Sequence, residues 1–169
     1  VEPYAEAAAM ARIDALSPED RSLVRRVAVF GLTFHPKMLS WFTDEFDGAL
    51  PVAATWARLH EFFDEEPDGY LRFRRSLLRD AAYEGLPFKL RRRLHGTVAM
   101  RIAQESDDVD ESASILSLHY FLAGDNKSAW RYATIAGKRA DSVYAYVEAA
   151  QLYARALDAG KHLGDLGKE

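Results

Sequence analysis

The residues in this sequence with the clearest capacity for chemistry are arginines near its centre. The first group spans eight positions and consists of Arg72, Arg74, Arg75 and Arg79. A guanidinium group donates several hydrogen bonds in a fixed planar geometry that matches the oxygens of a phosphate or a carboxylate. One hypothesis is therefore an anion site. The other, which we favour, is a solvated basic face whose charges are paired with acidic neighbours.

A second basic group follows shortly afterwards and consists of Arg91, Arg92, Arg93 and His95. It is a hypothetical contact for nucleic acid or for a neighbouring domain. The simpler interpretation, which we again favour, is the polar side of an amphipathic helix.

The charge distribution gives both groups their context. Residues 70–101 carry nine basic and two acidic side chains, a net charge of +7, whereas the whole chain has a net charge of −4. A basic centre between acidic flanks can pair with those flanks, with a partner domain or with phosphates.

The sequence does not contain the residues and motifs that several other kinds of chemistry require. The chain has no cysteine, which excludes disulfides, thiol catalysis and cysteine-based zinc sites and is typical of a reducing cytoplasm. No phosphate-binding loop, dinucleotide fingerprint or nucleophile elbow is present, so we expect no enzyme activity and no cofactor in this chain. No apolar run approaches the roughly 18 residues of a membrane span, so we expect no membrane partner.

The isolated titratable residues indicate structural roles. Asp80 and Glu84 are four residues apart beside Arg79, where salt bridges are expected. Four histidines occur singly, without the spacing of metal ligands, and we expect each to be a cap, core or surface residue and no metal site to form: His35, His60, His119 and His162.

A hairpin followed by a helix must position the first arginine group. Leu71 and Phe73 alternate with polar residues, as on a half-buried strand. Apolar residues at helical spacing follow from Leu77. Before the strand, residues 66–69 form a turn signal of type I, and Phe62-Phe63 can supply the partner strand.

Helical patterns precede this hairpin. Residues 3–16 predict one helix, and a second begins at the Ser17 cap and ends at Gly31. A third opens at Pro36, carries Leu39 and Phe42, and closes near Asp47-Gly48. A fourth is predicted by one apolar face: Val52, Trp56, Leu59 and Phe63.

These elements predict a winged-helix unit with a two-stranded wing. The fourth helix holds the position that reads DNA in such units, but its polar face offers Arg58 as the only permanent cation. This shortage of cations makes recognition of the DNA major groove by the fourth helix an unfavoured interpretation.

The second half of the chain reads as helices alone. Leu90, Leu94, Val98 and Ile102 repeat every four residues, and an acidic linker over residues 105–111 follows. We expect this linker to separate two structural units. Beyond it, AGDNKSAWRYATIAGKRA and YVEAAQLYARAL are similar to the second helix of a tetratricopeptide hairpin, although their alanines are 20 residues apart instead of about 34.

The predicted fold class is mainly α. It consists of a winged-helix unit followed by antiparallel helices of an incomplete tetratricopeptide-like solenoid. The expected domains are a helix continuing from an upstream domain (1–16), the winged helix (17–87), a connecting helix with the acidic linker (88–110) and the repeats (111–169).

The motif FRRSLLRDAAYE, with RRLH behind it, resembles the pattern FRHxLLRDxAYExL…RRxLH of bacterial signal-transduction ATPases with numerous domains. The resemblance covers about residues 11–157. It implies a segment lying between an AAA-like ATPase core and tetratricopeptide-like repeats. Such chains often carry an adenylate or guanylate cyclase domain or a LuxR-type DNA-binding domain. The family commonly has His at the position of Arg75, and a winged-helix His senses nucleotide phosphates in related ATPases.

The resemblance implies a non-catalytic regulatory module of a cytoplasmic ATPase whose parent chain uses ATP and Mg²⁺. Its expected partners are the upstream ATPase domain of the same chain and a protein or small-molecule stimulus on the repeats. The alternative is a DNA-binding winged-helix regulator that uses the basic patch at residues 72–93.

Overall fold

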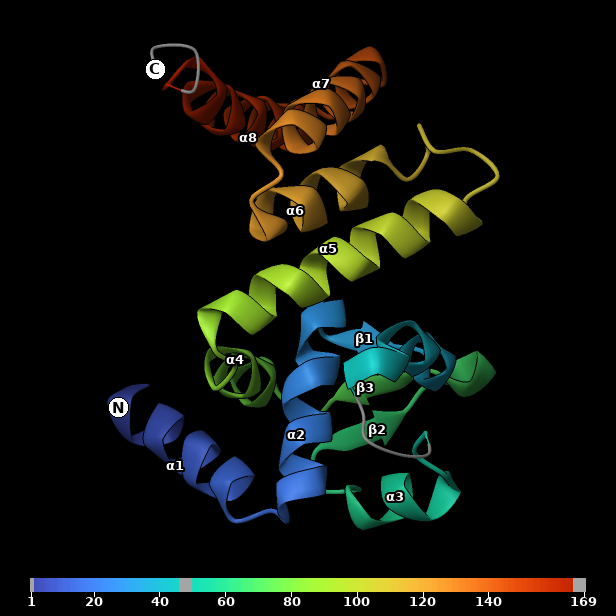
Figure 1. Ribbon diagram of the computed structural model, residues 1–169, viewed down its shortest axis with the longest axis vertical. Helices are drawn as coiled ribbons and strands as arrows, with labels where there is room; N and C mark the ends of the chain where they lie inside the picture. Colours follow the sequence, from blue (N-terminus) through green and yellow to red (C-terminus); the bar gives the residue numbers. More distant parts are fainter. Residues whose placement is uncertain (1, 46–49, 166–169) are drawn as a thin grey trace. The chain divides into compact units, whose positions relative to one another are not determined.

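The computed structural model describes residues 2–45 and 50–165, in which helices predominate (Figure 1). The contacts divide the chain into two compact units, one up to Arg91 and one from Arg92 onward. The predicted end of the third helix near Asp47-Gly48 lies outside the described residues. The helices and strands of the first unit are α1 (Glu2–Asp14), α2 (Pro18–Val27), η1 (Ala28–Phe30), β1 (Thr33–Phe34), η2 (Pro36–Glu45), α3 (Ala53–Arg58), β2 (Phe63–Glu65), η3 (Pro67–Gly69), β3 (Leu71–Phe73) and α4 (Ser76–Glu84).

The strand β3 forms the centre of a three-stranded antiparallel sheet with the order β1-β3-β2. Phe73 pairs with Phe63 of β2, and Leu71 pairs with Phe34 of β1. Leu71 and Phe73 are buried while Arg72 between them is exposed, so the predicted alternation is confirmed. The strand β1 was not predicted, because two residues are too few for a periodic pattern.

Aromatic packing forms the core beneath this sheet. The rings of Phe63 and Phe73 have centroids 4.7 Å apart, and those of Phe34 and Phe63 are 5.5 Å apart. The buried residues Leu78 and Ala82 of α4 continue the helical period that the sequence predicted. The sheet and α4 therefore share one apolar interior.

The start of α2 is fixed by two interactions of its first turn. The Ser17 hydroxyl accepts a hydrogen bond of 3.1 Å from the backbone N–H of Asp20, as predicted for an N-cap. The Asp20 carboxylate is buried and accepts two hydrogen bonds from Arg58 at the end of α3, at 2.9 and 2.7 Å. The bonds from Arg58 lower the pKa of Asp20 below its usual value.

The predicted fourth helix is much shorter than its apolar pattern suggested. The helix α3 ends at Arg58, and Phe63 lies in β2 instead. Val52, assigned to the buried face, is 63% exposed. Pairing of Phe63 with Phe73 across the sheet prevents the helix from continuing, so tertiary contacts outweigh the local period.

Two further local predictions need correction. The segment from Pro36 is a 3-10 helix bent at Phe42 (φ −107°, ψ 24°), although Leu39 and Phe42 are buried as expected. The turn before β3 is not of type I, because Asp68 has φ 60° where that turn requires a negative value. Asp tolerates this left-handed conformation better than most residues.

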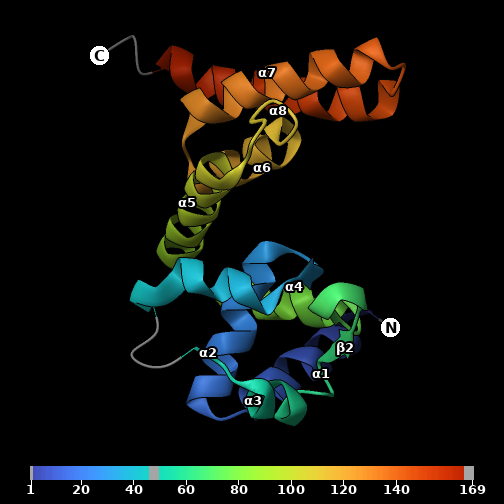
Figure 2. The same ribbon diagram turned by 90° about the vertical axis from the view of Figure 1, so that its right-hand side faces the viewer.

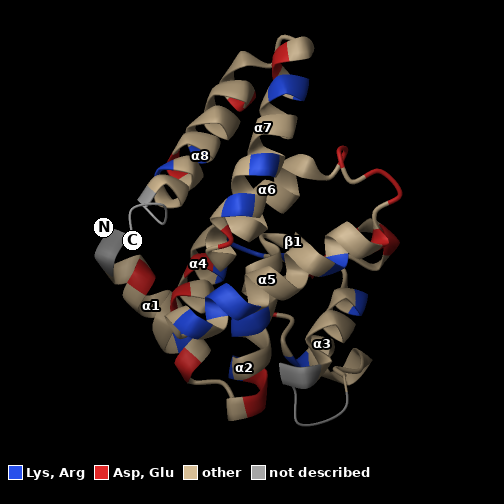
Figure 3. Ribbon diagram, turned by 45° about the horizontal axis from the view of Figure 1, so that its top comes forward, with Lys and Arg blue, Asp and Glu red and all other residues tan. Residues whose placement is uncertain are grey.

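The second unit contains α6 (Ala113–Ala123), α7 (Asn126–Ser142) and α8 (Tyr146–Asp165), together with most of α5 (Phe88–Glu105). The division between the units therefore falls inside α5. The acidic segment lies within the second unit, as the connection between α5 and α6, and does not separate the two units (Figure 3). A hydrogen bond of 2.7 Å between the hydroxyls of Ser106 and Ser112 closes this connection.

Small residues allow α7 and α8 to pack closely side by side (Figure 2). A Cβ atom at Gly137 would lie 2.7 Å from the Tyr153 ring, so only glycine fits there without a shift. Buried residues of three helices form the shared core: Ala113, Ala136, Ala140, Ala149 and Leu152. In the ranges 2–45 and 50–165, no helix combines the length and apolar character needed to cross a membrane.

We predict that Phe73→Ala lowers the free energy of unfolding by about 3 to 5 kcal/mol, because Phe73 is 1% exposed and its removal leaves a cavity among aromatic rings. Chemical denaturation measures the change. Tyr70→Ala, at a position that is 43% exposed, is the control and should change stability far less. Equal losses in the two variants would contradict this account of the sheet.

We predict a pH-dependent loss of stability for Asp20→Asn. Because the folded pKa of Asp20 is depressed, its contribution is present above the unfolded pKa of about 3.9 and is lost as the pH falls through the folded value. The variant should melt at a lower temperature than the wild type near pH 7, and the difference should shrink below about pH 4. Asp14→Asn, at an exposed ion pair with Arg25, is the control and should show little effect.

Candidate functional site

The first arginine group surrounds the junction of β3 and α4. Arg72 lies on the exposed face of β3, and Arg74 follows directly after the strand. Arg75 is the residue before the first turn of α4, and no side chain caps that turn. The alternation of β3 therefore directs Arg72, and Arg74 directly after the strand, away from the aromatic core.

Three of the four arginines already have acidic partners. Arg72 lies 4.0 Å from Glu66, and Arg74 lies 3.1 Å from Asp64 on the neighbouring strand. Such exposed ion pairs stabilise a fold only slightly. These contacts match the favoured interpretation of a basic face paired with acidic neighbours.

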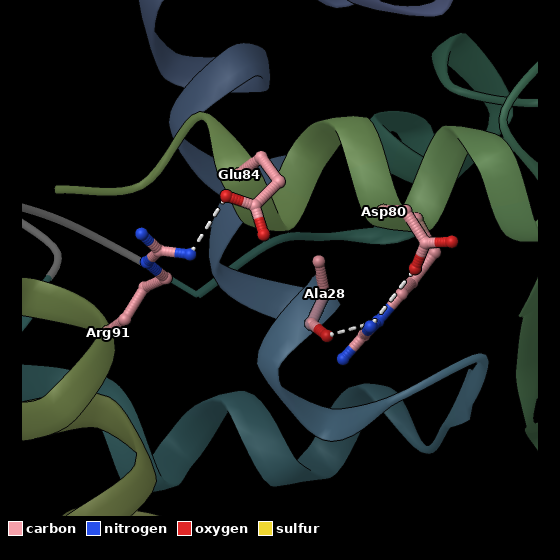
Figure 4. Close-up of polar contacts among 5 residues, drawn as sticks. Ala28, Asp80, Glu84 and Arg91 are labelled. Atoms are coloured by element: carbon pink, nitrogen blue, oxygen red, sulfur yellow. Dashed lines mark hydrogen bonds and ion pairs between the residues drawn. The ribbon is translucent and has the colours of Figure 1, made fainter. Parts of the chain in front are cut away.

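Arg79 has a structural role. Its Nε atom donates a hydrogen bond of 2.9 Å to the carbonyl of Ala28, and its Nη1 atom lies 3.1 Å from the Asp80 carboxylate (Figure 4). Its guanidinium also lies over the Tyr83 ring, 4.7 Å from the centroid. Arg79 therefore fastens α4 to Ala28, the residue that follows α2.

Arg75 lies in a different environment. Within the described part of the chain, its guanidinium makes no ion pair or hydrogen bond. It lines a surface hollow of about 400 Å³ whose lining residues come from α1, the β2 region and the start of α4: Arg12, Glu61, Asp64, Arg74, Arg75 and Leu78. Three arginines and two acids meet there.

Arg12 is the residue of this hollow that sequence reasoning missed. It belongs to α1, about sixty positions before the other two arginines, and its side chain lies 3.6 Å from Glu61. No spacing rule connects it with Arg74 and Arg75, because only the folded chain brings α1 beside α4. An incoming anion can bind Arg75 directly and draw Arg12 and Arg74 from their exposed carboxylate partners.

The members of the second basic group have different partners. In the first unit, Arg91 bonds to Glu84 at 3.0 Å (Figure 4). Its guanidinium also lies over the Tyr83 ring, 5.1 Å from the centroid. Burial raises the pKa of that Tyr83 hydroxyl. In the second unit, Arg92 donates a 2.9 Å hydrogen bond to the Ala123 carbonyl at the end of α6, where a cation is favoured. Arg93 is exposed.

His95 is buried and pairs with His119, the Nδ1 atoms being 2.8 Å apart. One ring must therefore donate and the other accept. From the sequence alone, His119 is interpreted as an isolated residue, because its partner lies 24 positions earlier and in a different helix. In the described ranges, no group of three metal-ligating side chains occurs.

The two histidines of the first unit make local contacts, and the two acids of α4 lie in salt bridges. The Nδ1 atom of His35 accepts a hydrogen bond from the N–H of Lys37, and that of His60 lies 3.0 Å from the Ala57 carbonyl. Asp80 and Glu84 pair with different arginines and form no acid pair.

Comparison with known proteins found no matching family model, no matching curated protein and no matching solved structure. The assignment of a role to the arginine hollow therefore depends on its residues and on the motif resemblance described above.

We predict that replacing Arg79 destabilises the fold, whereas replacing Arg75 hardly changes its stability. Arg79→Ala should lower the free energy of unfolding by about 1 to 2 kcal/mol, since the Ala28 carbonyl loses its donor and the Tyr83 ring loses one of the two cations that lie over it. Arg75→Ala should change it by less than about 0.5 kcal/mol. Chemical denaturation of both variants checks the assignment, and a larger loss for Arg75→Ala would overturn it.

Proposed function

We propose that this chain is a non-catalytic regulatory and protein-interaction module of a multidomain cytoplasmic signalling ATPase. In this proposal the first unit is a winged helix that packs on the ATPase core in one nucleotide state and releases it in the other. The second unit is a tetratricopeptide-like array that receives a protein or small-molecule stimulus. The parent chain would use ATP and Mg²⁺ and control an output such as a nucleotide cyclase or a transcriptional activator.

The observation that carries the proposal is the position of Arg75. This residue replaces the His of the resembled motif, and it lies at the start of α4 in a hollow with two other arginines. A phosphate or carboxylate of a neighbouring domain is the kind of group that such a hollow can hold. Because arginine stays charged near neutral pH, this contact would depend on the presence of the anion and not on pH.

The element order supports the winged-helix part of the proposal. Helix, short strand, two helical segments, a hairpin and a helix follow one another from α2 to α4, and the sheet order is β1-β3-β2. That arrangement is typical of winged helices. The antiparallel packing of α7 and α8 through small residues supports the repeat-like part.

The alternative, a DNA-binding regulator that uses the 72–93 patch, has less support. Arg58, the cation expected on the recognition helix, is held by two hydrogen bonds to Asp20. The patch is also divided between two units, with Arg91 and Arg92 bonded in different ones. A groove-reading surface needs several cations directed at one duplex.

We predict that Arg75→Glu in the longer protein changes its nucleotide-dependent activity, because it reverses the charge offered to the partner anion. Lys37→Glu, an exposed cation outside the hollow, is the control and should leave that activity unchanged. Circular dichroism of the isolated chain should show the same fold for both variants. The isolated chain should show no ATP hydrolysis or cyclase turnover.

Two results would contradict the proposal. The first is nucleotide turnover by the isolated chain that a point substitution within it removes. The second is a salt-sensitive mobility shift with random duplex DNA at a dissociation constant of about 10⁻⁴ to 10⁻⁶ M, lost in Arg75→Glu. The second result would place the DNA-binding alternative first.

A further inference from the structure

The turn between α7 and α8 exposes an apolar patch that packing does not explain. Its members are Val143, Tyr144, Tyr146 and Val147, which are 67%, 76%, 62% and 77% exposed. The rings of Tyr144 and Tyr146 contact each other edge to face at 6.0 Å. Contiguous exposed apolar side chains of this kind mark interaction sites on soluble proteins. We call these four residues the turn patch.

The backbone of Tyr144 has a left-handed conformation that is unusual for tyrosine. The N–H of Ala145 bonds to the Ala140 carbonyl and that of Tyr144 to the Asp141 carbonyl, which is the Schellman ending of a helix. This ending requires a left-handed residue, and Tyr144 has φ 62°. The same ending closes α6, where the left-handed residue is Gly124.

Tyrosine at such a position destabilises the turn relative to glycine or asparagine. Tyr144 gains little packing in return, since its ring is exposed and its described ring contact is the exposed Tyr146. The intervening Ala145, by contrast, packs on the core of α7 and α8. Hydrogen bonds and the packing of Ala145 therefore fix the backbone of the turn, while the Tyr144 ring is exposed to solvent.

A hollow of about 270 Å³ adjoins the turn patch, with Val143 belonging to both. The acids Asp110, Glu111 and Glu148 line it, together with the cation Arg139, which lies 3.3 Å from Glu111. Within the described residues, the carboxylates of Asp110 and Glu148 make no ion pair or side-chain hydrogen bond. The hollow therefore carries two uncompensated negative charges beside an apolar surface.

We propose that the turn patch and this hollow bind a protein segment that carries an aliphatic or aromatic side chain next to lysine or arginine. The apolar side chain packs against Val147 and the two tyrosines, and the cation enters the hollow toward Asp110 and Glu148. This inference deepens the proposed interaction role of the second unit and rests on it. It assigns the chemical character of the partner, basic and apolar.

The test uses the whole chain and a displayed library of peptides of about 12 residues. Enriched peptides should combine Lys or Arg with Leu, Ile, Phe or Tyr, and their synthetic, fluorescein-labelled forms should bind with dissociation constants of about 1 to 100 µM by fluorescence anisotropy. Val147→Ser and Glu148→Lys should each weaken binding at least about fivefold.

Matched controls lie further along the same helix. Leu157→Ser replaces another exposed apolar residue of α8, and Asp158→Lys reverses another exposed acid. Both should bind the peptides like the wild type. Tyr144→Asn should weaken binding while leaving the melting temperature unchanged or raising it, because asparagine tolerates the left-handed backbone.

The proposal is overturned if no peptide is enriched, if the enriched peptides are acidic, or if Val147→Ser and Glu148→Lys bind as the wild type does. It is also overturned if sedimentation shows that the chain self-associates through Val147, which would make the patch a contact between copies. The Arg75→Glu experiment measures nucleotide-dependent activity and this one measures peptide binding, so failure of one proposal is distinguishable from failure of the other.

Discussion

The first unit depends on the central position of β3. Successive side chains of a strand point to opposite faces of the sheet, and Leu71 and Phe73 of this central strand face the aromatic core. The same alternation fixes Arg72 and Arg74 on the opposite face. Because α4 begins three residues after the strand, the register of β3 also determines where Arg75 and Arg79 lie. A shift of one residue would exchange the core and the arginines.

This dependence explains how much of the first unit could be predicted from sequence. The period of two over Leu71 and Phe73 and the helical period from Leu77 are local signals, and both are confirmed. The two-residue β1 and the early end of α3 follow from pairing between distant segments, which a local pattern does not contain. The prediction of the arginine group was likewise local, so it could not include Arg12. It also could not tell the bonded Arg79 from Arg75, which has no such bond within residues 2–45 and 50–165.

The second unit follows a different physical rule, in which small residues bring helices together. The alanines of α7 and the glycine at 137 permit close contact with α8, and the sequence indicated this through its alanine spacing. The pairing of His95 with His119 was not predictable, because it depends on how α5 meets α6. The acidic segment was read as a boundary from composition alone. The contacts instead place the start of the second unit within α5, because residues from Arg92 onward bond to α6.

The arginine hollow and the turn patch differ in what the fold requires of them. Arg74 and Arg75 of the hollow follow from the register of β3, and Arg12 is brought to them by the packing of α1 beside α4. Arg12 and Arg74 have acidic partners, so a purely structural role accounts for both of them but not for Arg75. The fold does not explain the residues of the turn patch. Glycine or asparagine at position 144, and polar residues at positions 143 and 147, would suit the fold equally well. Local conflicts between sequence and structure tend to occur where function requires them. For this reason the backbone of Tyr144 is the stronger indication of a binding surface, although it carries no recognisable sequence motif.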